Sequence, residues 1–193
     1  MSRSSWLLLL VLALGACSRS EPRGDAPRDC GPSGPVVDTA LLAFLSQARS
    51  AHHVADAREA SGDGAAALRA LRGLTEAVKP PGAPPEVEEV LADTRARMAD
   101  LLSQAGQFDE ADAAIAAGLR NAPGPSYFRG HLMEVRGAVE ERREKALRGQ
   151  GRGQEADSAR ERSLAAYEEA MKIQAEVIDQ SLRRAGPAPS ASK

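Results

Sequence analysis

The chain has 193 residues, a formal net charge of -2 and only 3% aromatic residues. This length predicts one domain with room for flexible ends. Alanine and leucine dominate the composition and favour helices, whereas β-branched and aromatic residues in an alternating pattern are missing. The composition therefore excludes an all-β fold, and the nearly neutral charge argues against nucleic acid as a partner.

The first residues have the pattern of a secretion signal. Arg3 is followed by an apolar run that is too short to cross a bilayer. The run Leu14-Gly15-Ala16-Cys17 resembles the lipobox of bacterial lipoproteins. This resemblance implies a signal peptide over 1–16, a lipid on Cys17 that holds the protein on a membrane, and a place in the bacterial cell envelope. The resemblance favours the outer over the inner membrane, because Ser18 follows the cysteine. In enteric bacteria an Asp at that position is associated with retention in the inner membrane. The alternative is an ordinary cleaved signal with an incidental cysteine.

Residues 17–37 are rich in proline, glycine, serine and charge, and they predict a disordered tether. Cys30 is the only cysteine besides Cys17. If Cys17 carries lipid, Cys30 has no partner within the chain, so it is either a free thiol or part of an intermolecular disulfide.

Six helices are predicted from Asp38 onward, because apolar residues recur at steps of three or four. Asp38 or Thr39 can cap the first of them, and Ser126 can cap the fifth. The helices form three hairpins, at about 38–79, 85–123 and 126–185, and a disordered tail is predicted over 186–193. The second helix is expected to turn Val78 inward. The inward stripe of the sixth helix is predicted to be Leu164, Tyr167, Met171, Ile178 and Leu182.

The second hairpin has small residues where two helices must approach closely. Ala99 lies in its first helix, Gly106 in the turn, and Ala111, Ile115 and Gly118 in its second helix. This pattern resembles the tetratricopeptide repeat. The first hairpin resembles the repeat through Ala55, Gly62, Ala67 and Leu71.

The resemblance implies an all-α fold, a short tetratricopeptide-like α-solenoid of about three helical hairpins. The third hairpin is then a degenerate repeat or a cap, with Gly137 as the candidate close contact. A generic helical bundle is the alternative.

In this family the first helix of each hairpin lines a groove that binds a protein or peptide. On this sequence the resemblance assigns to the groove Arg49, His52, His53, Asp56 and Glu59 in the first unit and Asp93, Arg97, Asp100 and Gln104 in the second. Ala96 and Asp100 break the pattern of groove residues that clamp a terminal carboxylate. We therefore expect a lipid-anchored adaptor or scaffold that binds another envelope protein or peptide by other contacts.

The sequence contains no recognisable catalytic or nucleotide-binding motif, so we expect no enzymatic activity and no cofactor. We also expect no metal site. Adjacent His52 and His53 point about 100° apart on a helix and cannot easily share one ion. Glu140 and Glu141 are interpreted as solvated members of surface ion pairs.

Two further surfaces leave alternatives open. The basic residues Arg142, Arg143, Arg148 and Arg152 form either a solvated patch or a contact for anionic lipid headgroups. The long sixth helix suggests an alternative function, in which the chain is a structural subunit that self-associates through Met171 and Ile178 into a homo-oligomer.

Overall fold

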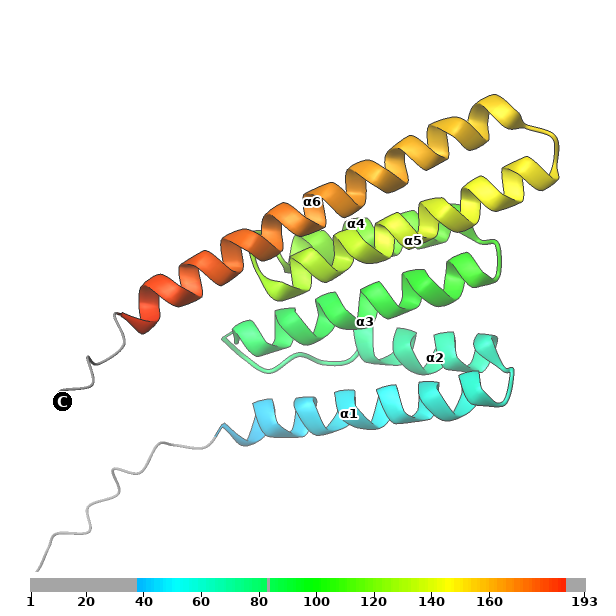
Figure 1. Ribbon diagram of the computed structural model, residues 1–193. Helices are drawn as coiled ribbons and strands as arrows, with labels where there is room; N and C mark the ends of the chain where they lie inside the picture. The colour runs from blue at the N-terminus through cyan, green and yellow to red at the C-terminus, as the bar shows by residue number, and fades with distance from the viewer. Residues whose placement is uncertain (1–37, 83, 187–193) are drawn as a thin grey trace, which may run out of the picture. The chain divides into compact units, whose positions relative to one another are not determined.

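A computed structural model describes residues 38–82 and 84–186 (Figure 1). Over these residues the fold is all-helical, as predicted, and contains no strand. The helices are α1 (Thr39–Ala60), α2 (Gly64–Thr75), α3 (Pro85–Gln104), α4 (Phe108–Asn121), α5 (Tyr127–Gly149) and α6 (Gly153–Ala185). The predictions for the signal peptide, Cys17, Cys30, the tether and residues 187–193 lie outside the described residues.

The helix N-terminal caps predicted at Asp38 and Ser126 are present in the structure. The carboxylate of Asp38 accepts hydrogen bonds of 3.0 Å from the backbone N–H groups of Ala40 and Leu41. The hydroxyl of Ser126 accepts one of 3.1 Å from the backbone N–H of Arg129. These bonds satisfy N–H groups that have no partner within the first helical turn, and so they fix the starts of α1 and α5.

The three hairpins close through the same kind of turn. Each turn contains a glycine in the left-handed region, with φ of 78° at Gly62, 75° at Gly106 and 76° at Gly151. The residue after each glycine donates its N–H to the carbonyl five residues earlier, and the next helix begins directly afterwards. This is the usual glycine-ended helix, in which a side chain would strain the backbone. The glycines are 44 and 45 residues apart, so the hairpin recurs along the chain.

The hairpins stack in sequence order, with all three turns at the same end (Figure 1). α3 packs on both α1 and α2, α5 packs on both α3 and α4, and α6 packs on α5. A fully buried alanine follows each turn glycine by five residues, at Ala67, Ala111 and Ala156. These small side chains let the helices approach closely, so each hairpin buries the apolar face of its neighbour.

Two helical glycines lie in very close helix contacts. A Cβ atom at Gly118 would lie 2.6 Å from Cδ2 of Leu132, and one at Gly137 would lie 2.7 Å from the ring of Tyr167. The prediction that Gly137 makes a close contact is confirmed.

The predicted inward stripe of α6 is wrong except at Tyr167, whose ring packs against Gly137 of α5. Leu164, Met171, Ile178 and Leu182 are 55%, 61%, 60% and 68% exposed, and Tyr167 is half-buried. The face that α6 buries against α5 consists mostly of small residues, namely Ala156, Ala159, Ser163, Ala166, Ala170 and Ile173. α5 contributes Gly130 and Gly137 to this contact, and such a short separation between helices leaves no room for a row of large side chains.

Val78 also differs from its prediction. It follows the end of α2 and is exposed. Leu71 and Leu74, which share the predicted stripe of that helix, are buried as expected.

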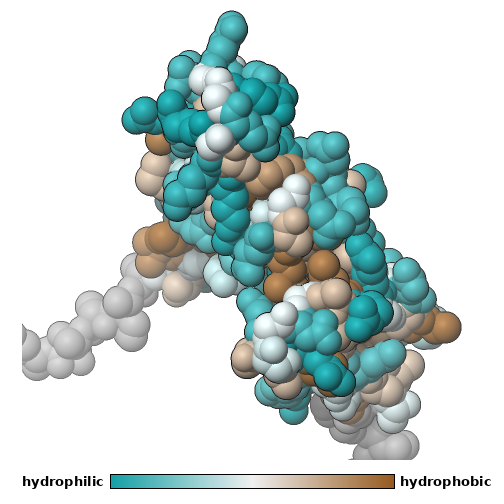
Figure 2. Space-filling model, turned by 90° about the vertical axis from the view of Figure 1, so that its right-hand side faces the viewer, coloured by the Kyte–Doolittle hydropathy of each residue, from teal (hydrophilic) through white to brown (hydrophobic). Residues whose placement is uncertain are grey.

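The surface at the turn end is mostly hydrophilic, with hydrophobic residues showing between the polar ones (Figure 2). Among residues 38–82 and 84–186, no helix is both long and apolar enough to cross a membrane.

Candidate functional site

The predicted groove residues lie on α1 and α3, and several of them bind one another. Arg97 of α3 reaches α1, where its Nη2 atom lies 2.5 Å from Oδ1 of Asp56 and 3.1 Å from Oε2 of Glu59. Its Nη1 atom donates to the backbone carbonyl of His52 at 3.4 Å. These bonds join the first hairpin to the second.

The same connection recurs one hairpin later. Arg142 of α5 lies 2.7 Å from Oδ1 of Asp100 and donates a 2.8 Å hydrogen bond to Oγ of Ser103, both on α3. Gln104 donates to the other carboxylate oxygen of Asp100 at 2.8 Å. Relative to the turn glycines, Arg142 and Asp100 occupy the positions of Arg97 and Asp56. A repeated arginine–aspartate pair therefore links successive first helices of the hairpins.

His52 is the predicted groove residue that reaches furthest inward. Its Nε2 atom lies 3.0 Å from Oγ1 of fully buried Thr94, and that hydroxyl donates to the carbonyl of Val90 at 2.7 Å. Since the threonine proton is already used, Nε2 of His52 is the donor to Oγ1. Burial lowers the pKa of His52 below its ordinary 6.5, opposed by nearby Asp93 and assisted by Arg97.

This histidine–threonine pair is structural rather than nucleophilic. Thr94 has no exposed surface on which a substrate could approach, and its proton points to a backbone carbonyl instead of to the histidine. Among the other predicted groove residues, His53 is exposed with Nδ1 3.9 Å from Asp56, Arg49 is exposed, and Asp93 is half-buried. No group of three metal-ligating side chains occurs in the described residues.

The sequence interpretation missed a buried carboxylate. Glu140 of α5 is 2% exposed, and its two oxygens accept 2.9 Å hydrogen bonds from Arg143 and from Arg162 of α6. Its interpretation as a solvated residue is wrong. The position of Glu140 in the sequence could have indicated its burial, because it shares one helix face with the buried Met133 and Gly137.

Arg143 connects this carboxylate to α4. It lies 2.5 Å from Oδ2 of Asp112, donates to the carbonyl of Phe108 at 3.2 Å and stacks over the ring of Phe108, 5.4 Å from its centroid. Arg143 is also one of four arginines that the sequence offered as a basic patch. Each of the four has a carboxylate partner, in the pairs Arg142–Asp100, Arg143–Asp112, Arg148–Glu144 and Arg152–Glu155. This pairing favours a solvated patch over a contact for anionic lipid.

A groove runs between α4 and α6, with α5 as its floor. Two hollows in it, of about 470 and 340 Å³, share Arg143 and Arg162. The first is lined by both apolar and paired charged residues, among them Phe108, Leu147 and Arg152. Its arginines are held by the carboxylates just described, so the groove offers shape more than free charge.

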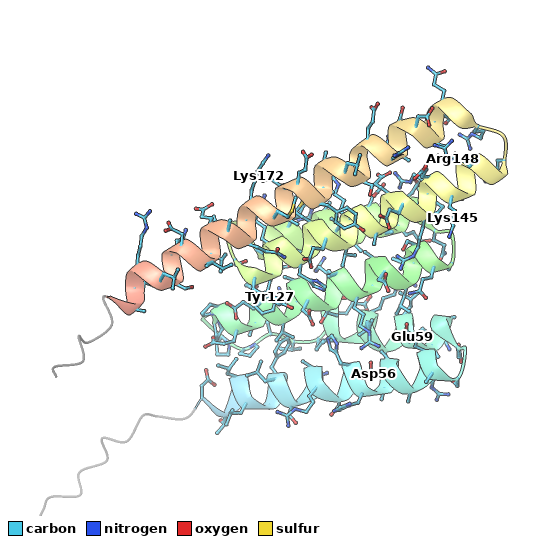
Figure 3. The ribbon with its side chains drawn as sticks, in the orientation of Figure 1. Asp56, Glu59, Tyr127, Lys145, Arg148 and Lys172 are labelled. Carbon is cyan, nitrogen blue, oxygen red and sulfur yellow. The ribbon has the colours of Figure 1, made fainter. Side chains whose placement is uncertain are left out.

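Charged residues of the first and third hairpins lie near their turns (Figure 3). Asp56 and Glu59 of α1 lie at the turn end, as do Lys145 and Arg148 of α5. At the other end of α5, Tyr127 is 64% exposed and its ring stacks on His131 with a centroid distance of 6.1 Å. Neither Tyr127 nor Lys145 was a predicted site residue.

No protein-family model, no curated protein and no solved structure matches this chain. The function must therefore be inferred from the geometry of the candidate site. The site consists of stacked hairpins, a polar face of paired charges on α1, α3 and α5, and an exposed apolar stripe on α6.

Proposed function

We propose that this protein is a lipid-anchored adaptor of the bacterial cell envelope. In this proposal the segment 1–16 is removed, Cys17 carries lipid, and residues 17–37 tether the helical domain to the outer membrane. The domain is a short tetratricopeptide-like solenoid that recruits another envelope protein. The observation that carries the proposal is the recurring hairpin, with matching turns at Gly62, Gly106 and Gly151.

Repetition of this kind supports a binding role, because stacked hairpins present one continuous face to a partner. The proposed groove on α1 and α3 changes in one respect from the sequence prediction. Asp56, Arg97 and Asp100 join the hairpins to each other, so they support the groove. We expect exposed neighbours such as Arg49 and His53 to contact the partner directly.

The anchor is tested by labelling cells with radioactive palmitate. We expect label on the wild-type chain, none on Cys17→Ser, and recovery of Cys17→Ser in the soluble fraction. Equal labelling of Cys17→Ser and the wild-type chain would contradict lipid attachment at Cys17.

The groove is tested by placing a photo-crosslinking amino acid at single positions in the full chain, in cells. His53 and Gln104 lie on the proposed groove side, and the exposed Arg69 of α2 and Arg120 of α4 serve as matched controls. We expect one envelope protein to be crosslinked from His53 and Gln104 and not from the controls. Equal yields from all four positions would refute the groove.

A second candidate function is self-association through α6. Its support is the row of exposed apolar residues Leu164, Met171 and Ile178, which no described helix covers. This candidate requires that sedimentation show a dimer at micromolar concentration and that Met171→Glu with Ile178→Glu restore the monomer. A wild-type monomer eliminates it.

A further inference from the structure

The third hairpin leaves one side of the stack open. Leu119 of α4 follows its turn glycine by 13 residues and packs against clusters containing Leu132 and Met133 of α5. Leu164 of α6 has the same offset from Gly151, so it lies on the corresponding face of the last hairpin. Within the described residues no further helix packs there, and Leu164 is exposed.

The open face is longer than one side chain. Met171 and Ile178 follow Leu164 at steps of seven residues, which keeps all three on one side of a helix. All three are more than half exposed. An apolar row of this length is what an additional helix buries when it packs alongside.

The first helix of the last hairpin also differs in charge from the first helices inside the stack. Asp56 and Asp100, six residues before their turn glycines, each receive an arginine from the next hairpin. The corresponding residue of the last hairpin is Lys145, which is exposed and has no ion-pair partner among the described residues. Three residues before the turn glycine, Glu59 of the first hairpin corresponds to Arg148 of the last, but Arg148 is already paired with Glu144 and Asp157, so Lys145 supplies the unpaired charge. An incoming helix would therefore meet the positive charge of Lys145 where α3 met Asp56 and α5 met Asp100.

We propose that the open face of α5 and α6 binds an amphipathic helix of a partner protein that carries acidic residues next to its apolar stripe. Its apolar side covers Leu164, Met171 and Ile178, and its carboxylate pairs with Lys145. A second copy stacked head to tail does not fit, because α1 would bring His53 to the position that requires an acid. This inference rests on the proposed adaptor function for the existence of a partner, but it uses a surface separate from the groove of α1 and α3.

The test uses two synthetic helices of about 22 residues, long enough to form stable helices. They share one leucine stripe and carry either Glu or Lys at the flanking positions. Binding to the full chain with Cys17→Ser, which removes the proposed lipid site, is measured by fluorescence anisotropy. We expect the Glu helix to bind at least about tenfold more tightly than the Lys helix, because like charges across an interface are strongly unfavourable.

Variants separate the parts of the proposal. Lys145→Glu should reverse the preference between the two helices, and Met171→Glu with Ile178→Glu should abolish binding of both. Lys172→Glu makes the same charge change on the exposed surface of α6 next to Met171 (Figure 3) and should leave the preference intact. Circular dichroism of each variant checks that it remains folded.

Three results would overturn the proposal. They are equal binding of the two helices, binding of neither, and dimerisation of the chain through Met171 and Ile178, which would make a second copy the occupant. If the helices fail to bind while the crosslinks from His53 and Gln104 persist, this inference falls and the proposed adaptor function stands.

Discussion

Replacing Glu140 by glutamine tests the buried ion pairs that connect α4, α5 and α6. The carboxylate is 2% exposed and accepts 2.9 Å bonds from two arginines. Removing one partner of a buried ion pair costs about 3–5 kcal/mol. Here the loss is smaller, because Arg143 keeps Asp112 as a partner and the half-exposed Arg162 can turn to water. We therefore expect Glu140→Gln to lower the free energy of unfolding by about 2 kcal/mol.

The assay is urea unfolding of the full chain with Cys17→Ser, followed by circular dichroism and extrapolated to water. A loss of this size corresponds to a melting temperature about 4–8 °C lower in a domain of this length. Glu161→Gln is the matched control, since Glu161 is exposed on α6 next to Arg162, and it should change stability by less than about 0.5 kcal/mol.

A double-mutant cycle with Arg162→Gln should show coupling between residues 140 and 162 of at least about 0.5 kcal/mol. If Glu140→Gln is no more destabilising than Glu161→Gln, the burial of this carboxylate and the reasoning built on it are refuted.

Three further predictions concern single positions. Gly137→Ala should cost about 1–2 kcal/mol in urea unfolding, because its Cβ would lie 2.7 Å from the ring of Tyr167; in a Tyr167→Ala background the cost should disappear, and its persistence would contradict the contact. Ala111→Leu should destabilise by about 1–3 kcal/mol while the exposed control Ala113→Leu changes stability by less than about 0.5 kcal/mol, and equal effects would argue against the close helix packing. Because burial lowers the pKa of His52 in the folded state, the unfolded chain takes up the proton first as the pH falls below about 6.5. His52 therefore removes stability on acidification from pH 7.5 to 5.5, and His52→Asn should lose less stability over that range than the wild-type chain; an unchanged pH dependence would count against the burial of His52.

The sequence by itself determined the six helices and most of their ends; the end of α2, expected beyond Val78, lies at Thr75. Helix caps and glycine turns act within a few residues, so Asp38, Ser126 and Gly106 could be assigned without knowledge of the fold. The buried alanines Ala67 and Ala111 were also predictable, because the spacing that resembles a known repeat places them where two helices meet.

Only the tertiary structure decided which faces of the later helices turn inward. In α6 both the large residues, such as Met171, and the small ones, such as Ala170, recur at helical spacing, and hydrophobicity favoured the large ones. The distance between α5 and α6 selected the small ones, and that distance depends on glycines of the neighbouring helix. The partners of Arg97 and Glu140 were hidden for the same reason, since ion pairs between hairpins depend on how the hairpins stack. Local order along the chain fixes where helices begin and end, but contacts between residues far apart in sequence fix what each helix buries and what it leaves exposed for a partner.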